Sequence, residues 1–408
     1  MNIGFYVHYT SLQAGGIFTY SIRVVKLLLN LDQINKIVLI ITAEQKEYFK
    51  FFDENKKLEF SIINRNKFFT NFRLAIWYLF YILIIIFQAI LPVKQVFNQL
   101  KYWLSKINPY TKIITSEGID LLHVPVKYSP LYKTDVPVII TMHDLQEYHF
   151  PQYFSLKERL LRFINNKICI KDSDHIIVSF EHVKKDIIKY FNIDSGKVSV
   201  CPPPLADNWF LKKEESDWNA IQKKFNLKKE FLLYPAATWE HKNHITLIKS
   251  LNILLSGGLK IDLVCTGNKT KHFSNISKMI DELKLSDIVH FLGIVPEEDL
   301  IGLYKNTSLV VIPTLYEAGS GPLYEAMRFE VPVICSDVTS LPVTIGNADF
   351  LFDPLDVNAL SSKIRQGLTD AEFRRSNIEN SRKRMEEFQK VDYSKNFLEV
   401  YNKLKQQK

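Results

Sequence analysis

Short apolar runs that alternate with helical stretches limit most strongly what this chain of 408 residues can fold into. In the first half, the expected elements are a helix at 18–31 and strands at 2–9, 36–42, 121–124, 136–142 and 175–179. Strands that alternate with helices in this way predict a parallel, doubly wound sheet. We therefore expect residues 1–204 to form one Rossmann-like α/β domain.

Three consecutive prolines at 202–204 separate this domain from a second series of strands and helices. Because proline fixes φ and lacks an amide hydrogen, the string CPPP favours an extended connector over a helix. Beyond the prolines, apolar strands are expected at 231–235, 261–266, 289–292, 309–312 and 332–335. The sequence thus predicts a second α/β domain over 205–385, with ligands bound in a cleft between the two domains.

The formal net charge of +8 suits anionic partners such as nucleic acids, anionic lipids or phosphorylated substrates. The sequence has no helix-turn-helix, zinc-finger or ribonucleoprotein-type motif, so nucleic acid is not an expected partner. The N-terminal residues do not resemble a signal peptide, and the four cysteines form no C-x-x-C pair. We therefore expect a cytoplasmic protein with buried free thiols.

An uncharged segment of twenty residues, 74–93, lies inside the first domain. It is long enough to span a bilayer, but spanning would separate the first two strands from the rest of their sheet. We expect a helix in the membrane surface, which makes the protein peripheral on the inner membrane face. A helix packed against the sheet and a spanning helix stay open as alternatives. The side chains then expected to meet headgroups or anionic lipid are Trp77, Tyr78, Tyr81, Arg73, Lys94 and Lys101.

A possible phosphate site lies in PTLYEAGSGPLYE, residues 313–325, directly after the strand expected at 309–312. Ser320 can cap the helix that follows, and a proline suits the first turn of that helix. Backbone N–H groups at a helix start face an anion, and glycines allow a ligand to approach closely. The residues expected to bind the phosphate group here are Gly319, Ser320, Gly321 and Leu323.

Glu317 and Glu325 are separated by seven residues in this segment. On spacing alone, two solvated glutamates would be the simpler interpretation. The pair follows an apolar strand, however, and is followed by EAMRFEVPVICSDVTSLPVTIGNADFLFDPLDVNAL. This whole segment resembles the donor-binding half of family 4 (group 1) retaining glycosyltransferases. The resemblance covers 231–360 and extends more weakly into the first domain, through TMHDLQ at 141–146 and neighbouring segments. It implies the GT-B fold, in which two Rossmann-like doubly wound domains face a cleft and a C-terminal helix, here 386–408, returns to the N-terminal domain.

The resemblance also implies roles for three residues of the second domain. Glu317 would contact hydroxyls of the donor sugar and Glu325 the nucleotide ribose, since a carboxylate accepts hydrogen bonds from vicinal hydroxyls. Lys242, in HKNH, would bind the donor diphosphate and stabilise the charge of the leaving group.

The second domain departs from the family pattern at Ala237, where the family usually has an arginine five residues before the lysine. One phosphate contact is therefore missing. We expect weaker donor binding, or compensation by His241 or His244.

Gly15, Gly16 and His143 are the site residues expected in the first domain. The glycines follow the first strand and precede a helix, where backbone N–H groups can face a phosphate. The chain lacks G-x-G-x-x-G, so no nicotinamide cofactor is expected. By resemblance, His143 reaches the donor sugar, although a lone histidine is often structural.

Asp172-Ser173-Asp174 spells the D-x-D metal string of the other main glycosyltransferase fold. It precedes an expected strand, so we interpret it as a helix end and turn, and we expect no metal.

The expected function is retaining hexosyl transfer from a nucleotide-diphosphate sugar to a lipid-linked or surface-polysaccharide precursor. The residues expected in catalysis are His143, Lys242 and Glu317. No cofactor is expected, because the lysine and the helix start can do what a divalent ion would do for the diphosphate. Two alternatives stay open: a nucleotide-sugar epimerase of the same fold, and a catalytically silent subunit that binds a nucleotide sugar.

Overall fold

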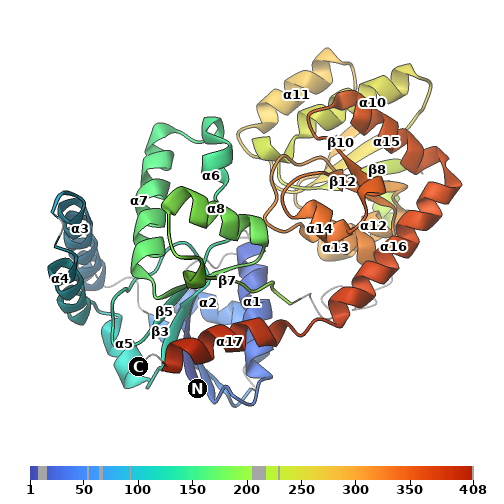
Figure 1. The fold of residues 1–408 in the computed structure, drawn as a ribbon. Helices are drawn as coiled ribbons and strands as arrows, with labels where there is room; N and C mark the ends of the chain where they lie inside the picture. The colour runs from blue at the N-terminus through green and yellow to red at the C-terminus, as the bar shows by residue number, and fades with distance from the viewer. Residues whose placement is uncertain are drawn as a thin grey trace. The chain divides into compact units, whose positions relative to one another are not determined.

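The computed structural model describes residues 1–7, 16–52, 55–63, 68–91, 93–204, 217–227 and 230–406. The chain divides into two compact units, one of Met1–Leu205 with Asp392–Lys408 and one of Ala206–Val391. Each unit is built on one parallel sheet with helices packed against it (Figure 1). The expectation of an α/β fold with doubly wound parallel sheets is confirmed.

The first unit contains a seven-stranded sheet with the order β3-β2-β1-β4-β5-β6-β7. Its strands are β1 (Asn2–Tyr6), β2 (Lys36–Thr42), β3 (Leu58–Ile63), β4 (Leu121–Val124), β5 (Val138–Thr141), β6 (His175–Val178) and β7 (Val198–Val200). Its described helices are α1 (Gly16–Leu29), α2 (Ala43–Lys46), α3 (Phe68–Ile90), α4 (Lys94–Lys106), α5 (Thr111–Ser116), α6 (Gln146–His149), α7 (Leu156–Asp172), α8 (Glu181–Phe191) and α17 (Tyr393–Gln406). Short 3-10 turns lie at η2 (Glu47–Phe52), η3 (Pro151–Tyr153) and η4 (Ser195–Lys197).

Both faces of this sheet are covered, as the alternation of side chains along β2 shows. Val38 and Ile40 belong to the core shared with α3, α7 and α8, whereas Ile37 and Leu39 belong to the core shared with α1 and α17. A strand buried on both faces is continuously apolar, which explains the pattern of the sequence. The four cysteines are buried free thiols, as predicted.

The C-terminal helix α17 packs on the first unit, where Phe397 and Leu404 are buried in the same core as α1. The Oη of Tyr401 on α17 lies 2.7 Å from Nδ1 of His123 on β4. Figure 1 shows α17, in red, beside the blue N-terminal elements. The expected boundary at 386 is wrong: residues 386–389 end the preceding helix, α16 (Ala371–Gln389), and the returning helix begins at Tyr393.

The second unit contains a six-stranded parallel sheet with the order β10-β9-β8-β11-β12-β13. Its strands are β8 (Phe231–Pro235), β9 (Asp262–Thr266), β10 (Val289–Phe291), β11 (Leu309–Ile312), β12 (Val333–Ser336) and β13 (Leu351–Phe352). Its described helices are α9 (Trp218–Phe225), α10 (His244–Ser256), α11 (Phe273–Glu282), α12 (Glu297–Asn306), α13 (Gly321–Arg328), α14 (Leu341–Ile345), α15 (Val357–Thr369) and α16 (Ala371–Gln389), with 3-10 turns η5 (Glu240–Lys242) and η6 (Ala348–Phe350).

The strand order of this second sheet reverses between β8 and β11. From β8 the chain adds β9 and β10 on one side, and from β11 it adds β12 and β13 on the other. Helices that leave neighbouring strands in opposite directions open a crevice at the carboxyl ends of those strands, and ligands of open α/β sheets bind there. The loops after β8 and β11 are therefore where a ligand is expected.

Helices α3 and α4 pack side by side as a hairpin at the edge of the first unit (Figure 1). One face of α3 is buried in the core, and its other face is exposed. The exposed apolar side chains of this hairpin include Leu79, Phe80, Leu83, Ile86, Phe87 and Ile90 of α3, and Val96, Leu100 and Trp103 of α4. Within the described ranges, no helix is both long enough and apolar enough to cross a membrane.

Trp77, Tyr81 and Lys101 do not lie on the exposed face where lipid contact was expected. The rings of Trp77 and Tyr81 are buried, with their centroids 4.9 Å apart. The Nζ of Lys101 is buried as well and lies 2.9 Å from both carboxylate oxygens of Asp172. The expectation of lipid contact for these three residues is wrong. α3 is apolar on nearly all sides, so its sequence does not reveal which face packs on the core, and Lys101 of α4 is drawn inward by its ion pair with Asp172.

Tyr78 is half-buried and donates its hydroxyl to Asn165 of α7. The side chains of Arg73 and Lys94 lie outside the described part of the structure.

Candidate active site

Lys242 and Glu317 meet at the reversal of the strand order in the second unit. Lys242 ends the 3-10 turn η5 in the loop after β8, and Glu317 lies in the loop after β11. The Nζ of Lys242 lies 2.6 Å from Oε2 of Glu317, and the two side chains are 19% and 12% exposed. This is a charge-assisted hydrogen bond that is largely shielded from solvent.

Further hydrogen bonds hold the two loops together. The backbone N–H of Leu315 donates to the carbonyl of His241 at 2.7 Å. Asn243, with a φ of +58°, donates its Nδ2 to the carbonyl of Pro313 at 2.9 Å. The approach of the lysine to the glutamate is therefore built into the backbone and does not depend on the ion pair alone.

The backbone of Glu317 is held by the loop that follows β12. Its N–H donates to Oγ1 of Thr339 at 3.0 Å, and its carbonyl accepts from the same Oγ1 at 2.8 Å and from Oγ of Ser340 at 2.9 Å. Sequence reasoning missed both hydroxyl residues, because they lie more than twenty positions away and no motif marks them.

The helix after the Glu317 loop starts as predicted. Ser320 is the N-cap of α13, its Oγ accepts from the backbone N–H of Leu323 at 3.4 Å, and a proline occupies the first turn. Gly319 has a φ of +136°, a conformation that favours glycine. The Leu323 side chain is buried in the core, so a phosphate contact by Leu323 would have to replace the capping bond of its amide.

Glu325 lies on α13 four residues after Gly321. Its Oε2 accepts from Oη of Tyr304 on α12 at 2.7 Å. Burial raises the pKa of Tyr304 far above its usual value, so the phenol stays protonated and can donate. A Cβ added to Gly321 would lie 3.4 Å from Oε1 of Glu325, which places this carboxylate next to the start of the helix. No sequence motif marked Tyr304, since it belongs to another helix.

The ring of His244 cannot replace the arginine that is absent at Ala237. It is buried beside Tyr234 and Phe291, with ring centroids 4.7 and 5.7 Å away. Burial lowers the pKa of His244 to about 3, so the ring is neutral near pH 7 and supplies no cation. The expected compensation by His244 is wrong, and that by His241 stays a prediction.

Gly16 and His143 belong to the first unit, and Gly15 lies outside the described residues. Gly16 begins α1 and is exposed, and a Cβ added there would meet no atom within 4 Å. The Nε2 of His143 donates to the carbonyl of Pro125 at 2.8 Å, and the ring packs edge-on against Tyr20. Burial lowers the pKa of His143, which favours the neutral ring. Its catalytic role stays a prediction.

Asp172 and Asp174 have structural partners. Asp172 ends α7 and pairs with Lys101, and Oδ2 of Asp174 accepts from the backbone N–H of Val138 at 2.8 Å. The interpretation of this string as a helix end is confirmed. Among the residues that the structure describes, no three histidine, cysteine or carboxylate side chains are grouped to hold a metal ion.

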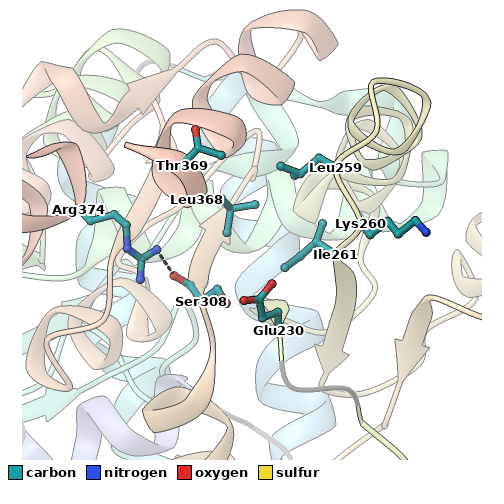
Figure 2. A pocket seen from close by; sticks show the side chains of 8 residues that line it. All are labelled: Glu230, Leu259, Lys260, Ile261, Ser308, Leu368, Thr369 and Arg374. Carbon is teal, nitrogen blue, oxygen red and sulfur yellow. Dashed lines mark hydrogen bonds between the residues drawn. The ribbon is translucent and has the colours of Figure 1, made fainter. Parts of the chain in front are cut away.

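A cavity of about 270 Å³ lies in the second unit, at the end of the sheet away from the Lys242 and Glu317 loops (Figure 2). Residues that directly precede β8, β9 and β11 line it, among them Glu230, Ile261 and Ser308. Arg374 donates to the carbonyl of Ser308 at 2.8 Å, as the dashed line shows. The cavity therefore lies at the amino ends of the strands, whereas the loops of Lys242 and Glu317 leave the carboxyl ends.

Two family models match the chain. The model described as glycosyl transferases group 1 matches residues 216–384, and the model described as glycosyltransferase family 4 matches residues 80–208. The O-antigen chain mannosyltransferase B of Escherichia coli is 27% identical over 240 residues, which are 58% of this chain and 62% of that protein. The match therefore spans less than two thirds of this relative.

Solved structures resemble the whole chain. A glycosyltransferase from Rickettsia africae has a TM-score of 0.68 at 16% identity, covering 99% of this chain and 98% of the other. HepE of Anabaena in complex with UDP-glucose has a TM-score of 0.66 at 13% identity, covering 99% of each chain. At such low identity these likenesses show the fold alone, which is GT-B. The two family models, one matched in each half of the chain, and the mannosyltransferase relative show that the chain belongs to the group 1 glycosyltransferases, similar to family 4.

Proposed function

We propose that the protein transfers a hexosyl group from a nucleotide-diphosphate sugar to a lipid-linked or surface-polysaccharide precursor, with retention of the anomeric configuration. The observation that carries this proposal is the pair of Lys242 and Glu317, which lies where the strand order reverses and next to the start of α13. Glu325 lies on the same helix start. A cation, a helix N-terminus and two carboxylates fit the diphosphate and hydroxyl groups of such a donor.

The diphosphate binds the Lys242 ammonium and the first backbone N–H groups of α13, whose end of the helix dipole is positive. Negative charge grows on the leaving diphosphate as the glycosidic bond breaks, so these groups stabilise the transition state more than the bound donor. Glu325 accepts from ribose hydroxyls and Glu317 from sugar hydroxyls. Support comes from the HepE complex, in which a protein of this fold holds UDP-glucose, and the name of the E. coli relative makes mannose the first sugar to test.

Transfer with retention proceeds on one face of the sugar. The bond from the anomeric carbon to the phosphate oxygen breaks, the acceptor oxygen bonds to that carbon on the same face, and the acceptor proton passes to the leaving phosphate. No side chain needs to act as general base, and in the described site the carboxylates of Glu317 and Glu325 already bond to Lys242 and Tyr304. Lys242 and the helix start supply the charge that a divalent ion supplies elsewhere, so we propose catalysis without metal.

The acceptor lies at a membrane surface, which the protein contacts through the exposed face of α3 and α4. The sequences of these two helices contain no aspartate or glutamate. Trp103 is 68% exposed and Ile90 is 70% exposed, and Leu83 and Ile86 extend the same apolar surface. Exposed apolar surface of this extent marks an interaction site, and the lack of carboxylates suits anionic lipid. The docking is peripheral, on the inner membrane face.

Release of nucleoside diphosphate tests this proposal against its two rivals. The protein is mixed with several nucleotide sugars, with and without a lipid-linked saccharide acceptor, and the products are resolved. Release only with acceptor, together with retained configuration in the product, supports transfer. An epimerised nucleotide sugar without release would support the epimerase, and binding without any product would support the silent subunit.

A further inference from the structure

Thr339, in the loop after β12, has an unfavourable backbone conformation. Its φ is +51°, in the left-handed region, where the Cβ of an L-residue crowds the backbone and a β-branched side chain is rarest. Glycine would adopt this conformation without strain. Backbone strain of this kind persists only where other contacts enforce it, so the contacts of the threonine indicate what it does.

The hydroxyl of Thr339 forms hydrogen bonds with both the N–H and the carbonyl of Glu317. Oγ1 accepts from the N–H of Glu317 at 3.0 Å and donates to the carbonyl of Glu317 at 2.8 Å. A hydroxyl has one donor and two acceptor sites, so it can make both bonds at once. The neighbouring Ser340 adds a second donor to the same carbonyl at 2.9 Å. Rotation of Glu317 about its backbone would break all three bonds.

Glu317 is the residue whose side chain must be aimed. Its Oε2 lies 2.6 Å from Nζ of Lys242, and Lys242 belongs to a loop with backbone bonds of its own. The loop around Glu317 contains Gly319, whose freedom about φ and ψ would otherwise let the carboxylate move. A small misplacement of a group that meets the reacting sugar has a large effect on rate.

We propose that Thr339 is a positioning residue of the donor site: it accepts a strained backbone so that its hydroxyl can hold the peptide of Glu317 and aim the Glu317 carboxylate at Lys242 and the donor sugar. The predicted effect on turnover rests on the proposed function, but the hydrogen bonds of Thr339 to Glu317 are a property of the structure. Ser340 assists through the carbonyl alone.

Four single variants separate the hydroxyl from the strain. Thr339→Ser keeps the hydroxyl, Thr339→Ala removes it and keeps the Cβ, and Thr339→Gly removes it and relieves the strain. Ser340→Ala removes the neighbouring hydroxyl, which bonds to the carbonyl of Glu317 alone, and should therefore have a smaller effect than Thr339→Ala. We expect Thr339→Ser to keep turnover within about threefold of the wild type, and Thr339→Ala and Thr339→Gly each to lose about tenfold or more in kcat.

The stability of the glycine variant distinguishes positioning from a merely structural role. We expect Thr339→Gly to melt at or above the temperature of Thr339→Ala and yet to be no more active. In a Glu317→Gln background, Thr339→Ala should cause no further loss, because the carboxylate that it aims is gone. Turnover of Thr339→Ala or Thr339→Gly within twofold of the wild type would overturn the proposal.

Hydrogen exchange of the peptide that contains Glu317 gives a readout that does not need activity. Exchange should rise in Thr339→Ala and Thr339→Gly, stay unchanged in Thr339→Ser and rise less in Ser340→Ala. If the wild type transfers no sugar from any donor, the proposed function fails, but this experiment still shows whether Thr339 holds the backbone of Glu317. Unchanged exchange in both the alanine and the glycine variants would show that Thr339 does not hold Glu317.

Discussion

The Nζ of Lys242 lies 2.6 Å from Oε2 of Glu317, which joins the loop after β8 to the loop after β11. In the proposed function, a donor diphosphate competes with the Glu317 carboxylate for the Lys242 ammonium. When the phosphate takes the lysine, the carboxylate is released toward the sugar hydroxyls that it is proposed to bind. The proposed donor binding would thus exchange one charge pair for another and leave neither group unpaired in a site that is largely shielded from solvent.

Replacement of Glu325 by alanine should weaken nucleotide binding and reduce turnover by at least about a hundredfold, since loss of one well-placed polar contact costs ~3 kcal/mol. Calorimetric titration with nucleoside diphosphates measures the first effect, and steady-state kinetics the second. Glu298→Ala, which removes an exposed glutamate of the same unit, is the matched control and should leave both unchanged. Normal affinity and turnover in a folded Glu325→Ala protein would show that Glu325 does not bind the donor.

Activity should persist in excess chelator, because Lys242 and the start of α13 are proposed to neutralise the diphosphate without a metal ion. The assay is product formation before and after dialysis against chelator. Complete loss of activity that added manganese or magnesium restores would contradict this, and would reopen the question of Asp172 and Asp174.

Several strands of both sheets could be predicted from the sequence alone. β2, β4, β8 and β11 begin and end at the expected residues, because strands buried on both faces are continuously apolar and are bounded by polar or turn-forming residues. β3 was missed since it is a partly exposed edge strand. β13 has two residues, too few for any periodic pattern, and β7 has three, which include Ser199 and lie just before the prolines assigned to the connector.

Only those parts of the candidate site that depend on neighbouring residues in the sequence could be predicted. The Ser320 cap and the start of α13 follow from residues that are adjacent in the sequence, and they were predictable. Thr339 and Tyr304 hold the two glutamates from other loops and helices, so only the packed sheet brings them into contact. For the same reason the sequence could not tell that Trp77 packs inward.

Membrane docking should depend on the exposed face of α3. The double variant Leu83→Glu/Ile86→Glu places two carboxylates on that face, where they oppose both apolar insertion and anionic lipid, so binding should be lost. The measurement is flotation with liposomes that contain anionic lipid, at low and high salt. Binding of the wild type should weaken at high salt, because part of the attraction is electrostatic.

The matched control for this experiment is Asn358→Glu/Gln389→Glu, which adds the same charge at exposed positions of the second unit and should float like the wild type. Flotation of the Leu83→Glu/Ile86→Glu protein equal to that of the wild type would assign docking to another surface. No flotation of any form would mean that the hairpin does not bind lipid.

Stability should fall as the pH is lowered, in part because of His123. Its ring is fully buried between Oη of Tyr401 and Oγ1 of Thr141, and burial lowers its pKa to about 3. The unfolded chain, with a pKa of about 6.5 for this ring, binds more protons than the folded chain between about pH 6.5 and about pH 3, so acidification through this window favours unfolding. From about pH 7 to about pH 5 the free energy of unfolding should fall by ~2 kcal/mol for this residue.

Urea unfolding at the two pH values measures this loss. His123→Gln lowers the overall stability, because it disturbs the contacts with α17, but it should also reduce the pH dependence by the contribution of one histidine. An unchanged difference between the two pH values in the variant would show that His123 does not titrate as described.

The most direct test of the donor site compares the wild type with Lys242→Ala in the acceptor-dependent release of nucleoside diphosphate. The account predicts release by the wild type only when donor and acceptor are both present, and a rate at least about a hundredfold lower for a folded Lys242→Ala protein, because the leaving diphosphate loses its cation. Near-normal release by the variant, or release by the wild type that does not depend on an acceptor, would contradict it.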